Sequence, residues 1–414
     1  MREMKDSGVE WLGEVPAGWE LHRAKHLFKL TNDRGNDDLT LLAATQKQGM
    51  WPQDRLEGVV RVKDDTDLSK FRTVHKNDYV ISLRSFQGGF ERSDFEGVCS
   101  PAYQTFCAIK PIDYQYFKYL FKSPSFIDHM NSLTLGIREG KTIKFDDFAT
   151  QALAVPPLDE QRRIEGFLDE KCAEIDRAVS AAERSIEEYK AYKNSVVFQA
   201  VTKGLDSDVP MADSGLDWIG CAPKHWDVLE QKWLMRKKKS ICEKWQGESV
   251  LSLTIGGVIV RDVESGKGKF PATFDGYQYI DAGNLVLCLF DIDVTPRCVG
   301  LARQDGVISP AYSQFAMLPG AEARFYDYYL RAMDDRKLYL GLTSTMRHSF
   351  TADAFGLIHA LRPPVDEQLR IANYLDAKTA EIDRLVLSKQ AIIGDLKAYK
   401  QSLIYEAVTG KREV

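Results

Sequence analysis

Two pairs of residues in this sequence have types and spacing that could support chemistry. His22 and His26 are four residues apart, which would place both imidazoles on one face of a helix. Asp291 and Asp293 form a carboxylate pair with one residue between them. A zinc site in a protein needs three or four ligands, and the two histidines have no further ligands close by, so we expect no metal site there. No Glu-x-Lys pattern follows the two aspartates at a convincing place, so we interpret them as a solvated turn.

Motifs for phosphate binding and for methyl transfer are missing. Residues 265–269, SGKGK, lack the upstream glycine and the trailing Ser or Thr of a P-loop. The two Pro-Pro pairs, at 156–157 and 363–364, continue into Leu-Asp-Glu and Val-Asp-Glu. They therefore do not match the Asp/Asn-Pro-Pro-aromatic motif of amino-methyltransferases. We predict that the chain has no catalytic residues and is neither a nuclease nor a methyltransferase by itself.

The composition is typical of a globular protein of the cytoplasm. The chain has 414 residues, of which 44% are hydrophobic and 28% are charged, enough for two to three domains. It has no apolar run of membrane-spanning length, and its start, MREMKDSGVEW, lacks an apolar signal region. The seven cysteines are scattered and form no CxxC pair, as expected for reduced thiols.

The Pro-Pro pairs belong to a repeat that fills the chain. PPLDEQRRI at 156–164 returns as PPVDEQLRI at 363–371, which is 207 residues later. The same offset relates SGVEWLGEVPAGW (7–19) to SGLDWIGCAPKHW (214–226), and the short words AEIDR, KAYK and AVT recur with it. Because 414 is twice 207, the chain consists of two tandem copies of one unit. No candidate catalytic group occurs in both copies.

Each copy ends in a long helical segment. Residues 159–202 contain no proline and a single glycine, and their apolar residues recur at heptad spacing. Pro156 and Pro157 would end the preceding strand, and Asp159 is expected to cap the helix. Lys193, Lys389 and Lys400 interrupt the heptad pattern. The predicted helix-pairing residues are Leu168, Ile175, Val179, Ile186, Tyr189, Leu375, Ile382, Val386, Ile393 and Leu396.

A long helix with a narrow apolar stripe needs a partner, and the second copy supplies one. If the two copies are related by a two-fold axis, their helices pair antiparallel as a coiled coil. The alternative is that each helix packs on its own globular domain. The sustained heptad pattern favours pairing between the helices.

The remainder of each copy is predicted to be a globular domain. Its strands and helices do not alternate strictly, which indicates an α+β fold or an irregular α/β fold. Short helices are predicted at 113–123 and 323–335. Strands are predicted at 58–62, 79–83, 106–110, 152–155, 250–254, 258–260, 285–289, 315–318 and 359–361. The predicted order is a first domain (1–156), a first long helix (157–205), a second domain (206–362) and a second long helix (363–414).

The doubled PP-x-DEQ motif before a long helix, with an SG-x-x-W-[LI]-G-x-x-P-x-x-W segment before each domain, resembles the specificity subunit (HsdS) of type I restriction-modification systems. The resemblance covers the whole chain. It implies that each globular domain is a target recognition domain that reads one half of a bipartite site in double-stranded DNA. It also implies that the two conserved helices pair antiparallel and set the gap between the half-sites.

The resemblance further implies partner subunits. Two HsdM methyltransferase subunits would bind the chain, and HsdR motor-nuclease subunits would join the full complex. Methylation of adenine N6, with S-adenosylmethionine as cofactor, would then take place in the partners, so no cofactor is expected in this chain.

Candidate DNA-binding residues lie in polar loops. Arg, Lys, Gln, Ser and Thr side chains are suited to base edges and phosphates. In the first domain the candidates are Gln46, Lys47, Gln48, Arg84, Gln87, Arg92, Arg138, Lys141 and Thr142. In the second domain they are Thr254, Arg261, Lys267, Lys269, Arg297, Arg303, Arg347, His348 and Ser349. Residues 236–240, RKKKS, are candidates for phosphate contacts.

Some of these candidates have a structural interpretation as well. Arg138 and Arg347 occupy equivalent places in the two copies and would either contact DNA or hold their domains together. SPAY, which contains Tyr103 and Tyr312, also occurs in both copies and is better explained by a structural role. Domains that read different sequences must differ where they read, so shared residues are better candidates for phosphate or scaffold contacts. A solvated surface position is the alternative for any single Arg or Lys.

The net charge of −5 argues against a strong grip on phosphates by this chain alone. We expect modest DNA affinity, with partner subunits supplying much of the phosphate contact. The alternative function is a structural coiled-coil adaptor whose globular ends bind proteins. Divergent polar loops on a shared frame favour DNA recognition.

Overall fold

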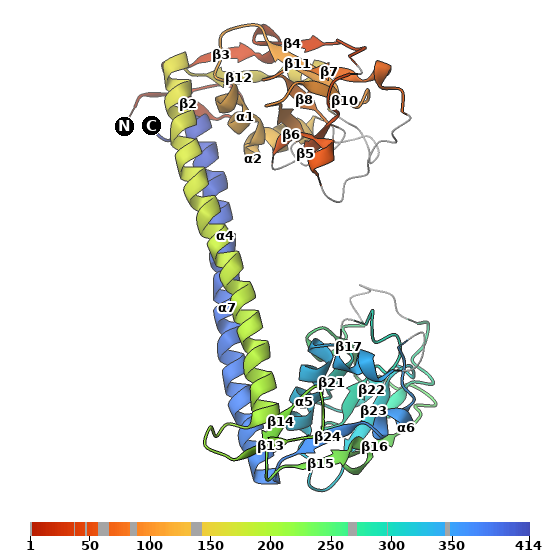
Figure 1. Ribbon diagram of the computed structural model, residues 1–414. Helices are drawn as coiled ribbons and strands as arrows, with labels where there is room; N and C mark the ends of the chain where they lie inside the picture. The colour runs from red at the N-terminus through yellow and green to blue at the C-terminus, as the bar shows by residue number, and fades with distance from the viewer. Residues whose placement is uncertain are drawn as a thin grey trace. The chain divides into compact units, whose positions relative to one another are not determined.

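The computed structural model of the chain describes residues 2–36, 38–45, 48–56, 66–82, 89–133, 143–263, 271–295, 297–343 and 348–414. The chain divides into two compact units. Unit 1 comprises Met1–Glu183 and Gln390–Val414, and unit 2 comprises Arg184–Lys389. Each unit therefore holds one globular domain and a part of each long helix (Figure 1). Among the described helices, none is long and apolar enough to cross a membrane.

The domain of unit 1 is built on short strands around a four-stranded antiparallel sheet. The described strands are β1 (Met4–Asp6), β2 (Glu14–Pro16), β3 (Glu20–Arg23), β4 (Phe28–Thr31), β5 (Leu42–Thr45), β6 (Gly49–Pro52), β7 (Arg72–Val74), β8 (Tyr79–Ile81), β9 (Phe90–Arg92), β10 (Gly97–Cys99), β11 (Gln104–Ala108) and β12 (Ala152–Val155). The sheet has the order β4-β11-β8-β9. The predicted strands at 79–83 and 106–110 overlap its two central strands, and the predicted strand at 58–62 lies outside the described residues.

The domain of unit 2 repeats this sheet. Its described strands are β13 (Met211–Asp213), β14 (Cys221–Pro223), β15 (Asp227–Glu230), β16 (Met235–Lys238), β17 (Val250–Thr254), β18 (Gly257–Val260), β19 (Gln278–Ile280), β20 (Leu285–Leu287), β21 (Val299–Leu301), β22 (Gly306–Ile308), β23 (Ser313–Met317) and β24 (His359–Arg362). The central order β16-β23-β20-β21 is antiparallel throughout. Phe315 of β23 stands opposite Leu285, as Phe106 of β11 stands opposite Tyr79 in unit 1.

Each domain is closed by pairing its first and last parts. In unit 1, β3 is antiparallel to β12, the strand that leads into the Pro-Pro pair. In unit 2, β15 pairs with β24 in the same way. The chain therefore enters and leaves each domain on neighbouring strands. A second sheet in unit 2, with the order β18-β17-β22-β19, includes a parallel pairing of β17 with β22.

The described helices are α1 (Tyr114–Lys122), α2 (Pro124–Ser132), α3 (Phe145–Ala149), α4 (Leu158–Lys203), α5 (Ala323–Asp335), α6 (Ala352–Gly356) and α7 (Val365–Val408). The helices predicted at 113–123 and 323–335 correspond to α1 and α5. The two long helices are α4, with 46 residues, and α7, with 44 residues. The predicted cap at Asp159 was wrong, because α4 already begins at Leu158 and Asp159 lies in its first turn. There its charge still favours the positive end of the helix dipole.

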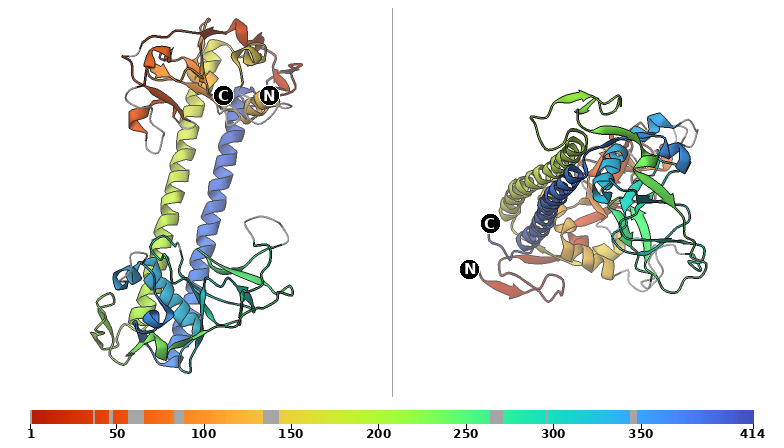
Figure 2. Two further views of the ribbon diagram at one scale, coloured as in Figure 1. Left: turned by 90° about the vertical axis from the view of Figure 1, so that its right-hand side faces the viewer. Right: turned by 90° about the horizontal axis from the view of Figure 1, so that it is seen from below.

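The long helices run antiparallel where they meet in unit 1. The Nζ atom of Lys400 on α7 lies 2.6 Å from a carboxylate oxygen of Asp176 on α4. Farther along α4, Glu183 lies 3.5 Å from Lys397. The residue numbers rise along α4 while they fall along α7, so the two helices point in opposite directions (Figure 2).

The same arrangement recurs in unit 2. Lys193 of α4 forms an ion pair with Asp383 of α7 at 2.7 Å, and this pair is equivalent to the pair of Lys400 with Asp176. Lys389 lies over the ring of Tyr189, at 5.8 Å from its centre. The three lysines that interrupt the heptad pattern thus contact the partner helix. This geometry confirms the expected antiparallel pairing of the helices.

The predicted helix-pairing residues lie mostly inside. Those that are buried are Leu168, Ile175, Val179, Ile186, Leu375, Ile382 and Ile393. Tyr189, Val386 and Leu396 are half-buried. Leu375 also belongs to the core of the unit 2 domain, together with Val197 of α4. Near their ends, therefore, the helices pack on the domain as well as on each other.

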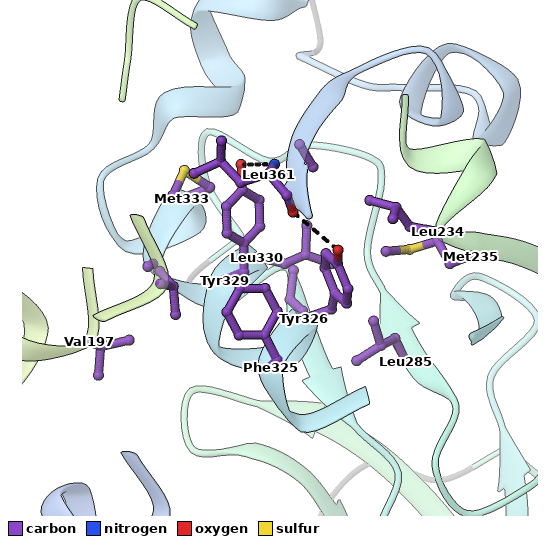
Figure 3. Close-up of a cluster of buried hydrophobic side chains, with 14 of the residues drawn as sticks. Val197, Leu234, Met235, Leu285, Phe325, Tyr326, Tyr329, Leu330, Met333 and Leu361 are labelled. Carbon is purple, nitrogen blue, oxygen red and sulfur yellow. Dashed lines mark hydrogen bonds between the residues drawn. The ribbon is translucent and has the colours of Figure 1, made fainter. Parts of the chain in front are cut away.

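Each domain has an aromatic core around one helix. In unit 1, Phe28 of β4 contacts Phe117 and Phe121 of α1. In unit 2, Phe325, Tyr326 and Tyr329 of α5 fill the corresponding space (Figure 3). The hydroxyl of Tyr326 donates to the backbone oxygen of Leu361 at 3.1 Å, which joins α5 to β24. Burial raises the pKa of the Tyr326 phenol, as expected for a hydroxyl that serves as a neutral donor in a core.

Candidate nucleic-acid interface

Many of the predicted DNA-binding residues lie outside the described residues. They are Gln46, Lys47, Arg84, Gln87, Arg138, Lys141, Thr142, Lys267, Lys269 and Arg347. The remaining candidates are placed by the structure, and two of them, Thr254 and Arg297, meet at one hairpin.

A β-hairpin at the front of each domain carries candidates at its tip. β5 pairs with β6 in unit 1, and β17 pairs with β18 in unit 2. The hydroxyl of Thr45 donates to the Gly49 carbonyl at 3.0 Å, and the hydroxyl of Thr254 donates to the Gly257 carbonyl at 2.9 Å. The candidate Thr254 therefore closes the turn of its hairpin. Gln48, in the other hairpin, is exposed.

Both glycines that end these turns have a positive φ, and a Cβ atom at either one would meet a close neighbour. Gly257 has a φ of 109°, and a Cβ atom there would lie 2.3 Å from the guanidinium of Arg331. Gly49 has a φ of 77°, and its Cβ would lie 2.4 Å from the backbone oxygen of Arg92. L-residues with side chains rarely adopt such φ values. Both hairpins thus share a Thr-to-Gly closure, although their tips differ in length and in residue type.

Two arginines hold the hairpin tip of unit 2. Arg297 donates through Nε to the Ile255 carbonyl at 3.3 Å. Arg331 of α5 donates to the Gly256 carbonyl at 3.0 Å. Arg297 also forms an ion pair with Asp335 at 2.7 Å. These contacts anchor the tip to α5 and leave the side chain of Ile255 69% exposed.

Acidic residues on α5 balance these arginines. Asp327 lies 3.4 Å from Arg331, and burial raises the pKa of Asp327 even though the cation lowers it. Asp334 accepts from the backbone N–H of Cys298 at 2.8 Å and also contacts Lys337. The structure therefore places Arg297 in an internal network of its domain. No signal in the sequence could have shown this, because an arginine in a loop is equally typical of the surface and of the scaffold.

A cavity of about 580 Å³ opens beside this hairpin in unit 2. It brings together two sequence candidates, Thr254 and Arg297, and the SPAY residue Tyr312. Tyr312 also packs on a core cluster that includes Leu251. This packing agrees with the structural role expected for SPAY. Ile255, which sequence reasoning did not select, also lines the cavity, because an isolated apolar residue in a turn carries no polar signal.

The other described candidates occupy separate places. Arg92 of β9 donates to Asn77 at 3.0 Å and forms an ion pair with Asp94, so it is bound within its domain. Arg261 is half-buried just after β18, and Arg303 is exposed. The Ser349 hydroxyl accepts from the backbone N–H of Asp291 at 3.2 Å.

His348 has a backbone conformation with a positive φ, and it contacts neighbouring segments. Its φ is 43°, its ring lies 2.9 Å from the Thr343 hydroxyl, and its carbonyl accepts from Ile292 at 3.3 Å. His348 therefore lies against the 291–295 turn.

Exposed basic residues line β16, the edge strand of the central sheet in unit 2. Arg236, Lys237 and Lys238 are all exposed on it, and Lys239 follows. Lys238 forms an ion pair with Asp281. The basic run at 236–240 is therefore accessible, as a phosphate contact requires.

In the described part of the chain, no three His, Cys, Asp or Glu side chains come together as a metal site would require. The Asp291–Asp293 turn bonds to its neighbouring loops, and His22 lies 2.7 Å from Glu20. Neither predicted pair acquires a third ligand there.

Comparisons with known proteins agree on the fold. No protein-family model matches the chain, and no curated protein does. Two solved structures share the arrangement of two α+β domains with two long helices. A solved chain from work on complex assembly and conformational transition of the type I R-M system is similar, with a TM-score of 0.70 and 14% identity. The match covers 95% of this chain and 98% of that chain.

The HsdS subunit from Thermoanaerobacter tengcongensis is also similar in structure. It has a TM-score of 0.56 and 13% identity, and the match covers 99% of this chain and 100% of that chain. The chain therefore has the fold of the HsdS subunits of type I restriction-modification systems. The expected α+β fold with paired helices is confirmed, and so is the resemblance at the level of the fold.

Proposed function

We propose that the chain is the non-catalytic DNA-specificity subunit of a type I restriction-modification complex. Each globular domain reads one half of a bipartite site in double-stranded DNA, and the paired helices set the gap. One observation carries this proposal: the two domains share a frame and differ at exposed tips. The Thr45 and Thr254 closures are the same, while Gln48 stands near one tip and Ile255 at the other.

The partners in this proposal are two HsdM methyltransferase subunits, with HsdR motor-nuclease subunits in the full complex. S-adenosylmethionine would bind to the methyltransferase subunits, and the whole complex would act on DNA in the cytoplasm. The long helices offer apolar side chains for docking, since Tyr374, Leu387 and Tyr399 of α7 are exposed.

The test is co-expression with a methyltransferase subunit encoded beside this chain, followed by mapping of modified bases in the host genome. We expect N6-methyladenine in one bipartite motif with a fixed gap. The purified chain with S-adenosylmethionine, and without partners, should methylate nothing. DNA footprinting with the assembled complex should protect both half-sites.

A stable complex that protects no specific sequence would instead support the adaptor function. Methylation by the purified chain alone would contradict the non-catalytic assignment. Exchange of one domain for that of another such chain should change one half-site and leave the other unchanged.

A further inference from the structure

The glutamine of each PP-x-DEQ motif is buried and fully bonded. Gln161 is 2% exposed and Gln368 is 0% exposed. The Gln161 amide oxygen accepts from the backbone N–H of Asp113 at 2.8 Å, and its amide nitrogen donates to the Pro156 carbonyl at 2.9 Å. Gln368 makes the same two contacts, to Glu322 N–H at 2.8 Å and to the Pro363 carbonyl at 2.7 Å.

These contacts reach the N-cap residue of the main helix in each domain. Asp113 is the N-cap of α1, and its side chain accepts from Tyr116 N–H at 2.8 Å. Glu322 caps α5 in the same way, through Phe325 N–H at 2.7 Å. Each glutamine therefore ties the start of a long helix both to the end of the preceding strand and to the start of the domain helix.

A second duplicated contact lies farther along each long helix. Asp169 of α4 accepts from the Tyr119 hydroxyl of α1 at 2.5 Å. Asp376 of α7 accepts from the Tyr328 hydroxyl of α5 at 2.8 Å. In unit 2, Arg324 adds an ion pair to Asp376 at 2.8 Å.

The two anchors in each unit are eight residues apart on the long helix, a span of roughly 12 Å at 1.5 Å per residue. A single anchor would let the domain helix pivot on the long helix. Two anchors along the axis restrain that tilt. Because α1 and α5 carry the aromatic cores, with Phe117 and Phe121 in one and Tyr326 and Tyr329 in the other, holding the helix holds the whole domain.

We propose that each pair of anchors, Gln161 with Asp169 and Gln368 with Asp376, fixes the angle of a recognition domain on its long helix and thereby keeps the gap between the half-sites at one value. This inference rests on the proposed function. One base pair corresponds to about 3.4 Å along the duplex, so a small tilt of either domain would change the gap that fits. The anchors are positioning residues and would contact no DNA.

The test uses the double variant Asp169→Ala with Asp376→Ala in the full chain, co-expressed with its methyltransferase partner. Asp169 is exposed and Asp376 is half-buried, so both changes should leave the fold intact. The matched control is Glu174→Ala with Glu381→Ala. These equivalent glutamates pair with lysines of their own helices at 2.9 Å and do not contact a domain through any interaction described for them.

Modified-base mapping gives the first readout. The wild-type chain and the control should methylate one motif with one gap. The variant should methylate the same half-sites, and the fraction of sites whose gap is one base pair longer or shorter should rise at least about tenfold, as expected when one charge-assisted hydrogen bond no longer discriminates.

Distances between spin labels give the second readout, which needs no methylation. One label is placed on exposed Glu170 of α4 and the other on exposed Lys110 before α1, both in unit 1. The distance distribution should broaden in the variant and stay narrow in the control. Broadening together with a relaxed gap supports the inference. An unchanged distance distribution overturns it, whatever happens to methylation, and so does a single unchanged gap despite broadening. A wild-type chain without a bipartite motif would contradict the proposed function, and the label distances would still decide whether the anchors restrain the domain.

Discussion

Glu91 of β9 is an acid in the interior of the unit 1 domain. Its side chain is 3% exposed and lies 2.5 Å from the Nζ atom of Lys122. Burial raises the pKa of Glu91 from 4.5 to about 7, although the lysine lowers it. The folded domain therefore binds a proton at Glu91 more tightly than the unfolded chain does.

This pKa makes the stability of unit 1 depend on pH. The contribution of Glu91 is most favourable below about pH 4.5, and it is lost as the pH rises from 4.5 to about 7. The substitution Glu91→Gln removes this titration. Between pH 5 and pH 8, the unfolding free energy of the wild type should therefore fall by about 2–3 kcal/mol more than that of the variant. Urea unfolding at both pH values measures the difference. Glu10→Gln, at an exposed position, should behave like the wild type, and equal pH slopes for all three proteins would count against the raised pKa.

Arg297 and Arg303 offer a second prediction at the residue scale. Arg297→Ala should lower stability by about 1–3 kcal/mol, because Asp334 and Asp335 then lose a cation inside the domain. Arg303→Ala should leave stability unchanged, because Arg303 is exposed. If Arg303 contacts a phosphate, its loss should weaken DNA binding equally for all sequences and reduce the salt slope by about 1. Thermal unfolding and binding at several salt concentrations measure both effects, and a stable Arg297→Ala variant would contradict the internal role.

The types of single residues predicted their roles less well than repeated patterns predicted the helices. Both arginines stand in loops, and the sequence does not tell which one turns inward to an aspartate. The heptad lysines show the same ambiguity, because a lysine at a seam position is as compatible with solvent as with an ion pair across the seam. In both cases the missing information is which residues of a distant segment stand opposite.

At the scale of elements, the paired helices carry one ion pair twice. Lys400→Glu, opposite Asp176, should destabilise the helix pair in unit 1 by about 0.5–1 kcal/mol, since partly exposed pairs contribute little. Adding Asp176→Lys should restore the loss. A double-mutant cycle by thermal unfolding measures the coupling.

The equivalent pair in unit 2, Lys193 with Asp383, is the built-in comparison and should give a similar coupling energy. Strictly additive effects at both places would show that the pairs do not help to set the helix register.

The long elements of this chain were predictable, and so were some core strands such as β12 and β17, but other short strands were not. A stripe repeated over many turns identified α4 and α7, and α5 matches its predicted bounds. Strands such as β7, β9 and β10 have three residues each, which is too short for an alternating pattern to stand out. Their pairing also depends on residues that are distant in the sequence. The predicted cap at Asp159 was wrong because the helix begins at Leu158, directly after the second proline. The carbonyl of Pro157 already accepts from the backbone N–H groups of Glu160 and Gln161.

At the scale of the whole molecule, the acidic total of −5 limits what the chain does alone. We expect the isolated chain to bind its site weakly and with a shallow dependence on salt, and the assembled complex to bind tightly with a steep dependence, because partner subunits add phosphate contacts. Fluorescence anisotropy at several salt concentrations compares the two. Tight, steeply salt-dependent binding by the chain alone would contradict the expectation.

The length of the long helices offers a further prediction for the whole molecule. Inserting seven residues after Ser180 of α4 and seven after the equivalent Leu387 of α7 keeps the heptad seam and adds about 10 Å to the helix pair. The half-sites should stay the same, and the gap should grow by about three base pairs. Modified-base mapping reads both. A changed half-site would mean that the helices do more than separate the domains.

The strand pairs β3 with β12 and β15 with β24 have a consequence for how such chains can change. Because each domain is entered and left on adjacent strands, the segment between Arg23 and Ala152 can be replaced while the chain enters and leaves at the same place, provided that the new segment keeps the contacts of Asp113 and Tyr119 with α4. Near-identical sequence segments flank both domains, so a genetic crossover within these segments would join a foreign domain to the unchanged long helices. Under the proposed function, a chain built in this way would acquire a new half-site in one recombination event, without any adjustment of its long helices.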